Sequence, residues 1–196
     1  MKFTKGYWMN LPGVTNTDAV QVREVKVEND RVYLYTVPYH ADMRAMGGPL
    51  LEMYISSPQP DIIRTEAYHF MGSNQKMPAF ELNDAHCALE VENTETTVTI
   101  KSGNTKLVIG KNPCSFDYYY KDKKLTSVGN RFGSAMISTI STPDGNYMRA
   151  QMDLDIGEKV YGLGERFTPY VKNGQTVETW NEDGGTCTEI SYTSIP

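Results

Sequence analysis

Short runs in which apolar and polar residues alternate follow one another along most of the chain. The clearest run sets five apolar residues between polar ones: Met148, Ala150, Met152, Leu154 and Ile156. Strict alternation puts one face of a strand inside and the other in solvent, so it predicts a half-buried strand over residues 148–156. No segment has the apolar stripe of an amphipathic helix. The chain is therefore predicted to be all-β.

Shorter alternating runs predict a series of hairpins. The predicted strands lie near residues 20–27, 32–37, 51–55, 62–70, 87–91, 98–100, 107–109, 116–120 and 125–128. The phase of the alternation reverses between Val22 and Val25, which predicts a bulge near Arg23 and Glu24. Turn-forming residues at 29–30 and 102–104 mark reversals of the chain. Many short strands separated by turns are typical of an antiparallel β-sandwich.

Composition narrows the classes of function. The 196 residues, 39% hydrophobic and 22% charged, are typical of a soluble globular protein. We favour one domain over residues 1–196, although two small domains also fit this length. A formal net charge of −5 argues against nucleic acid as a partner, because such proteins need clustered basic residues. The basic group at 121–124 is interpreted as a hairpin tip, and no apolar run reaches membrane-spanning length.

The cysteines and histidines do not suggest a metal site. Cys87, Cys114 and Cys187 are an odd number without the spacing of zinc ligands, and the three histidines are far apart in sequence. No apolar secretory signal opens the chain, so a reducing cytoplasm is the expected location. A disulfide plus one free thiol in a secreted protein is the alternative. No cofactor is expected.

Candidate chemistry is concentrated near the end of the chain. Gly162 and Gly164 permit backbone conformations that a Cβ forbids, and the adjacent Glu165 and Arg166 are expected to pair and support the loop.

A second stretch places Trp180 beside a polar turn that contains Asp183 and ends in two glycines. A carboxylate can accept hydrogen bonds from two neighbouring hydroxyls, and an indole packs against the C–H face of a pyranose ring. Asp183 and Trp180 are therefore candidate sugar-binding residues. The plainer interpretation is that Asp183 forms a turn and Trp180 anchors the loop.

Three motifs in this region resemble the N-terminal domain of glycoside hydrolase family 31, in particular of its bacterial α-xylosidases. They are Tyr161–Phe167 (YGLGERF), Asn173–Asn181 (NGQTVETWN) and Asp183–Gly185 (DGG). Weaker similarity reaches Gly6–Trp8, so the resemblance covers the whole chain. It implies a two-sheet sandwich of the galactose mutarotase-like supersandwich type.

The resemblance also implies a function. The chain would be a non-catalytic domain of a retaining α-glycosidase that cleaves α-linked xylosides or glucosides. The catalytic carboxylates of such enzymes lie on a (β/α)₈ barrel, and the chain is expected to end before that barrel and to be inactive alone. Asp183 matches an aspartate that contacts the sugar on the leaving-group side of the scissile bond. Glu182 departs from the family's motif, because relatives often carry a basic residue at this position.

Two alternatives remain open, namely a free-standing carbohydrate-binding module and a mutarotase-like sugar epimerase. An epimerase needs an acid and a base, and Glu66 with His69 is the only local pair. Their odd spacing along a strand places them on opposite faces. A sheet edge left unpaired at the end of the chain would favour a homo-oligomer.

Overall fold

The computed structural model describes residues 3, 9–38, 50–69, 86–128, 130–131, 134–164, 167–177 and 190–192. All regular secondary structure in these ranges is β-strand, which confirms the all-β prediction. Contacts divide the chain into a larger unit, Thr15–Asp153, and a smaller unit formed by Met1–Val14 and Leu154–Pro196.

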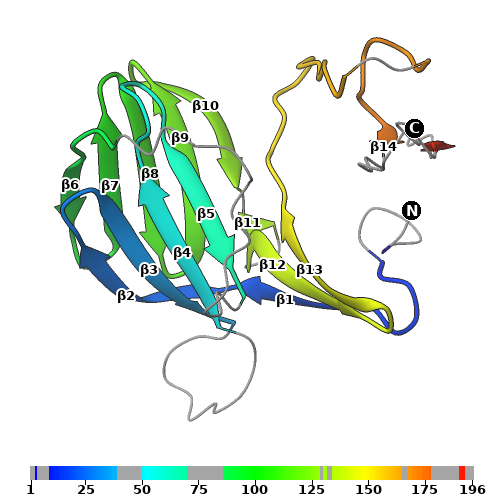
Figure 1. Cartoon of the computed structure of the whole chain (residues 1–196), viewed down its shortest axis with the longest axis horizontal. Coiled ribbons are helices and arrows are strands. Elements are labelled where there is room, and N and C mark those ends of the chain that lie inside the picture. The colour runs from blue at the N-terminus through cyan, green and yellow to red at the C-terminus, as the bar shows by residue number, and fades with distance from the viewer. Residues whose placement is uncertain are drawn as a thin grey trace, which may run out of the picture. The chain divides into compact units, whose positions relative to one another are not determined.

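The described residues of the larger unit form three antiparallel sheets (Figure 1). The first has the order β2-β3-β4-β5, with β2 Gln21–Val27, β3 Arg31–Val37, β4 Leu51–Ser56 and β5 Arg64–Tyr68. The second has the order β10-β9-β8-β7-β6, with β6 Glu90–Asn93, β7 Thr97–Ser102, β8 Thr105–Lys111, β9 Cys114–Tyr120 and β10 Lys123–Val128. In the third, β12 (Ser134–Thr142) pairs with β1 (Thr15–Ala19), β11 (Asn130–Arg131) and β13 (Gly145–Ala150).

One hydrophobic core joins the first and second sheets. The inward residues of β3 and β4, including Leu34 and Met53, share a cluster with Leu107 and Phe116 of β8 and β9, and all four are fully buried. Each of these strands alternates buried residues with more exposed ones, as the sequence pattern predicted. The two sheets therefore form a sandwich, which confirms the predicted fold class.

Val20 connects the three sheets near the start of the larger unit. Val20 lies between β1 of the third sheet and β2 of the first. Its N–H donates to the carbonyl oxygen of Val37 on β3 (2.9 Å), and its own carbonyl accepts from the N–H of Cys114 on β9 (2.7 Å). The chain thus changes sheet at this point. Immediately afterwards the register with β3 shifts between Val22 and Glu24, which confirms the predicted bulge.

The prediction of one half-buried strand over residues 148–156 is wrong. Only Met148–Ala150 of this range belong to a strand, and there Met148 and Ala150 are exposed while Arg149 between them is partly buried. Pairing of β13 with β12 ends at Ala150, and further on the Asp153 N–H donates to the carbonyl oxygen of Ser127 on β10 (2.9 Å). Met152 is 56% exposed and Ile156 is completely exposed. Alternation predicts one apolar face, but burial also requires a layer packed closely against that face, and Met148, Ala150 and Met152 instead line a cavity.

The hairpin tip between β9 and β10 agrees with the interpretation of the basic group. Lys121 and Asp122 both have positive φ, 46° and 62°, as a two-residue turn with right-handed strand twist requires. In the smaller unit, β14 (Gln175–Val177) and β15 (Ile190–Tyr192) pair antiparallel.

Candidate functional site

The glycine loop, residues 160–172 of the smaller unit, has a closed base. The N–H of Lys172 donates to the carbonyl oxygen of Val160 (2.8 Å). The side chain of Asn173 extends this pairing, since its Oδ1 accepts from the N–H of Val160 (2.8 Å) and its Nδ2 donates to the carbonyl oxygen of Glu158 (2.9 Å). These bonds fix the two ends of the loop beside each other.

The backbone conformation of this loop explains why it contains two glycines. Gly162, Leu163 and Gly164 all have positive φ, at 110°, 69° and 77°. A Cβ placed on either glycine would meet no atom within 4 Å. Glycine is therefore favoured at these positions by the backbone conformation, and not because a side chain would clash. Both glycines thus have the kind of backbone conformation that a Cβ disfavours, and their role in supporting the sugar-binding loop stays a prediction. Leu163 shares the conformation at a steric cost that glycine does not have.

Aromatic side chains of the glycine loop lie in solvent. The rings of Tyr161 and Tyr170 contact each other with centroids 5.0 Å apart and a tilt of 46°. Both are more than half exposed, and Phe167 is fully exposed. Exposed aromatic rings on one loop are typical of a contact surface for a ligand or another domain.

Lys172, which sequence reasoning missed, holds the end of the loop. Its side chain is buried, and Nζ donates to Thr168 Oγ1 (2.6 Å) and to the carbonyl oxygen of Pro169 (2.8 Å). A buried ammonium group requires such acceptors. Its role is thus to shape the turn at 168–172.

Four residues predicted for the site lie outside the described residues. They are the predicted sugar-binding residues Asp183 and Trp180, and the predicted supporting pair Glu165 and Arg166. Their roles remain predictions.

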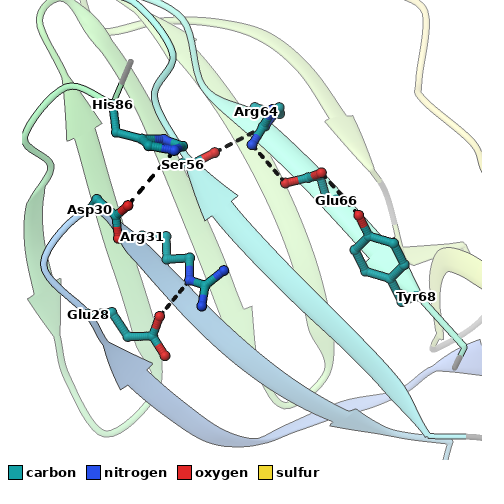
Figure 2. A network of polar contacts seen from close by, with 8 residues as sticks. All are labelled: Glu28, Asp30, Arg31, Ser56, Arg64, Glu66, Tyr68 and His86. Atoms are coloured by element: carbon teal, nitrogen blue, oxygen red, sulfur yellow. Dashed lines mark hydrogen bonds and ion pairs between the residues drawn. The ribbon is translucent and has the colours of Figure 1, made fainter. Parts of the chain in front are cut away.

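A second group of polar and aromatic residues lies on the outer face of the first sheet, and Glu66 is the one member that the sequence analysis considered. Arg64 and Glu66 of β5 form an ion pair (Nη2 to Oε2, 3.2 Å), and Tyr68 donates to Glu66 Oε1 (3.1 Å) (Figure 2). Arg64 Nε also donates to Ser56 Oγ of β4 (3.2 Å). Burial, and then the hydrogen bond to Glu66, raise the pKa of Tyr68. In the sequence, only the spacing of two residues between Arg64, Glu66 and Tyr68, which places them on one face of a strand, points to this group.

The same network bears on the epimerase hypothesis. Both oxygens of Glu66 are engaged, one by Arg64 and one by Tyr68, and His69 is exposed at the end of the strand. To accept a proton from a sugar, Glu66 would have to give up one of these contacts. The geometry therefore does not favour Glu66 with His69 as an acid–base pair.

A cavity of about 280 Å³ lies among β5, β9, β10, β12 and β13 of the larger unit. It is mainly apolar, and Thr65 and Tyr118 on its wall share a hydrogen bond of 3.0 Å between their hydroxyls. Arg149, also on the wall, pairs through Nη2 with Asp18 (2.9 Å). Burial raises the pKa of Tyr118, so this hydroxyl stays neutral.

Within the ranges that the structure describes, no group of three or more His, Cys, Asp or Glu side chains is arranged to hold a metal ion. Nor do the described residues form any helix long and apolar enough to cross a membrane.

The comparisons with known proteins define the family. Residues 52–196 match the model of the glycosyl hydrolase 31 N-terminal galactose mutarotase-like domain. The chain therefore belongs to this family, as the motifs predicted.

Two curated relatives carry a more particular name. The chain is 32% identical over 203 residues to alpha-xylosidase XylQ of Lactiplantibacillus pentosus, and 32% identical over 216 residues to an alpha-xylosidase of Emericella nidulans. Each match covers 100% of this chain, but only 26% and 28% of the relatives. The chain thus spans about a quarter of their length.

Solved structures confirm the fold. A cycloalternan-forming enzyme from Listeria monocytogenes, solved with a pentasaccharide substrate, has a TM-score of 0.64 at 19% identity over 89% of this chain and 15% of its own. A Flavobacterium johnsoniae GH31 dextranase solved with glucose has a TM-score of 0.59 at 15% identity over 80% of this chain and 18% of its own.

Proposed function

We propose that this chain is the non-catalytic N-terminal β-sandwich domain of a cytoplasmic retaining α-glycosidase that acts on α-xylosides or α-glucosides. The observation that carries the proposal is the 32% identity over the full chain to two proteins named alpha-xylosidase. Free thiols at Cys87 and Cys114 are consistent with a reducing compartment.

The domain would contribute to activity by positioning the sugar substrate. The glycine loop is closed at its base by Asn173 and Lys172, so the chain that follows it starts from a fixed point. We propose that this following segment, with Asp183 and Trp180, forms one wall of the sugar site beside a catalytic (β/α)₈ barrel. Asp183 would accept hydrogen bonds from a sugar hydroxyl and Trp180 would pack on a ring face. The bond-breaking carboxylates would belong to the barrel.

The test uses the protein that carries this chain together with a catalytic barrel. Asp183→Ala should raise KM by up to about tenfold and alter the preference among leaving groups, because one hydroxyl loses its acceptor. Turnover at saturation should change less, since the reacting carboxylates remain. Asp144→Ala is the matched control, because Asp144 lies in the turn between β12 and β13.

Kinetics of Asp183→Ala that equal those of Asp144→Ala across several aglycones would refute the role of the loop. Hydrolysis of p-nitrophenyl α-xyloside by the chain alone would refute the assignment of a non-catalytic domain.

A further inference from the structure

We propose that the outer face of the β2–β5 sheet is a second carbohydrate-binding surface, for a soluble, uncharged oligosaccharide. It consists of the tyrosine row, Tyr33, Tyr54 and Tyr68, with the carboxylates of Glu52 and Glu66. The surface goes beyond the proposed function and does not involve the loop with Asp183, although it takes the sugar class of its ligand from that proposal.

Strand register brings the tyrosine row together. Tyr33 of β3 pairs directly with Tyr54 of β4, and Tyr54 pairs with Glu66 on β5, two residues before Tyr68. The ring centroids are 5.3 Å apart for Tyr33 and Tyr54 and 6.1 Å apart for Tyr54 and Tyr68. Three half-buried rings thus lie in an unbroken line across three strands. Rings that keep part of their area in solvent can pack against the C–H faces of a sugar.

The carboxylates hold the tyrosine row in place and keep capacity for hydroxyls. Tyr33 donates to Glu52 Oε1 (3.0 Å), and Tyr68 donates to Glu66 Oε1 (3.1 Å). An ionised carboxylate has about four acceptor sites, so one or two donors do not saturate it. Glu52 lies opposite Tyr68 in the register, which places acceptors on both sides of the row. Aromatic faces next to preoriented acceptors are what a polyhydroxylated ring requires.

Charge on this face favours a neutral ligand. Its cations are paired with its acids: Lys26 with Glu24 (3.1 Å), Arg31 with Glu28 (2.5 Å) and Arg64 with Glu66 (3.2 Å). These three pairs cancel, and among the residues named for this surface only Glu52 adds a charge without a cationic partner. A single carboxylate gives no strong field for a polyanion or a polycation. An uncharged oligosaccharide has no such requirement.

The tilt of the rings distinguishes between kinds of glycan. The planes of Tyr33 and Tyr54 are inclined by 54°, and those of Tyr54 and Tyr68 by 70°. A crystalline polysaccharide surface is flat and would need coplanar rings. Inclined rings fit a single chain that can turn between them.

Two cations cover ring faces in the free protein and would compete with the sugar. Lys26 Nζ lies 5.3 Å from the centroid of Tyr33, and the guanidinium carbon of Arg31 lies 4.8 Å from that of Tyr54. Both side chains are about half exposed, and cation–π contacts at exposed sites are weak. Sugar binding would therefore displace them.

The experiment is a titration of the chain with maltotetraose and with a xyloglucan heptasaccharide, followed by NMR and calorimetry. Both the backbone and ring signals of Tyr33, Tyr54 and Tyr68 should shift, while those of Tyr120 should not. Tyr120 is the matched control, since it is partly exposed on β9 and also carries a lysine over its ring (Lys121, 5.4 Å). Insoluble cellulose should not retain the chain.

Variants then test the surface directly. Tyr54→Ala should weaken binding by about tenfold, which corresponds to about 1.4 kcal/mol. Tyr120→Ala should bind like the wild type, and Lys26→Ala should bind more tightly because the face of Tyr33 is uncovered. If Tyr54→Ala does not fold, the shifts in the wild-type chain still decide the question.

Unshifted tyrosine-row signals would overturn the inference, as would equal affinity of Tyr54→Ala and the wild type. The Asp183→Ala chain separates this inference from the proposed function. Persistent shifts at Tyr54 in that variant support the second surface even if Asp183 proves irrelevant to catalysis. Loss of all oligosaccharide binding in that variant would assign the sugar to the loop and overturn the inference.

Discussion

Tyr33 on β3 donates its phenolic hydroxyl to Glu52 on β4 across 3.0 Å. Burial, and then this hydrogen bond to an anion, raise the pKa of Tyr33 to about 12. The folded protein therefore holds the phenol in its neutral form over a pH range in which an unfolded tyrosine ionises.

Stability should consequently fall in alkali. The unfolded tyrosine loses its proton near pH 10 while folded Tyr33 keeps it to about pH 12. The stabilisation from this group is complete below about pH 10 and is lost as the pH rises to about 12. Tyrosine ionisation followed by absorbance should include a group with a pKa of about 12, and Tyr33→Phe should remove that group. A curve for Tyr33→Phe that still contains this group would contradict the assignment.

The two described thiols should differ in reactivity. Cys114 is fully buried, and burial raises its pKa to about 12, whereas Cys87 is partly exposed. Because the thiolate is the reactive form, a thiol reagent at neutral pH should modify Cys87 and spare Cys114 until the protein unfolds. The measurement is the count of modified thiols in a Cys187→Ser background, with and without urea. Two thiols modified in the native protein would contradict this.

Gly103, in the turn between β7 and β8, should not tolerate a side chain. Its φ is +57°, and a Cβ there would lie 2.3 Å from Asp61 Oδ1, the acceptor for the Asn104 N–H. We expect Gly103→Ala to reduce the free energy of unfolding by at least about 1–2 kcal/mol, measured in urea. In an Asp61→Ala background the loss should be smaller, because only the backbone penalty remains. Equal losses in both backgrounds would exclude the contact with Asp61 as a cause.

Asn173 should control the opening of the glycine loop. Asn173→Ala removes the hydrogen bonds to Val160 and Glu158, at a cost of about 1 kcal/mol. Since both bonds are exposed, the effect should be local. Hydrogen exchange at the Val160 amide should accelerate by about fivefold while exchange in the β3 and β8 core stays constant. Unchanged exchange at Val160 would show that the Lys172 pairing alone closes the loop.

The sequence predicted local features well. The alternation of Leu51, Met53 and Ile55 gave the phase of β4, and the reversal after Val22 gave the bulge. Gly162 and Gly164 were expected to need unusual backbone angles, and both have positive φ. Such features depend on a residue and its near neighbours, so a pattern along the chain contains them.

Tertiary structure decided what depends on partners distant in sequence. Alternation over residues 148–156 did not reveal that pairing with β12 ends at Ala150, because burial of a face requires a second layer. Nor did it reveal that Val20 joins two sheets through Val37 and Cys114. The tyrosine row arises in the same way. Each tyrosine has an outward phase in its own strand, but only the register of β3, β4 and β5 makes them neighbours, and register is a property of paired strands.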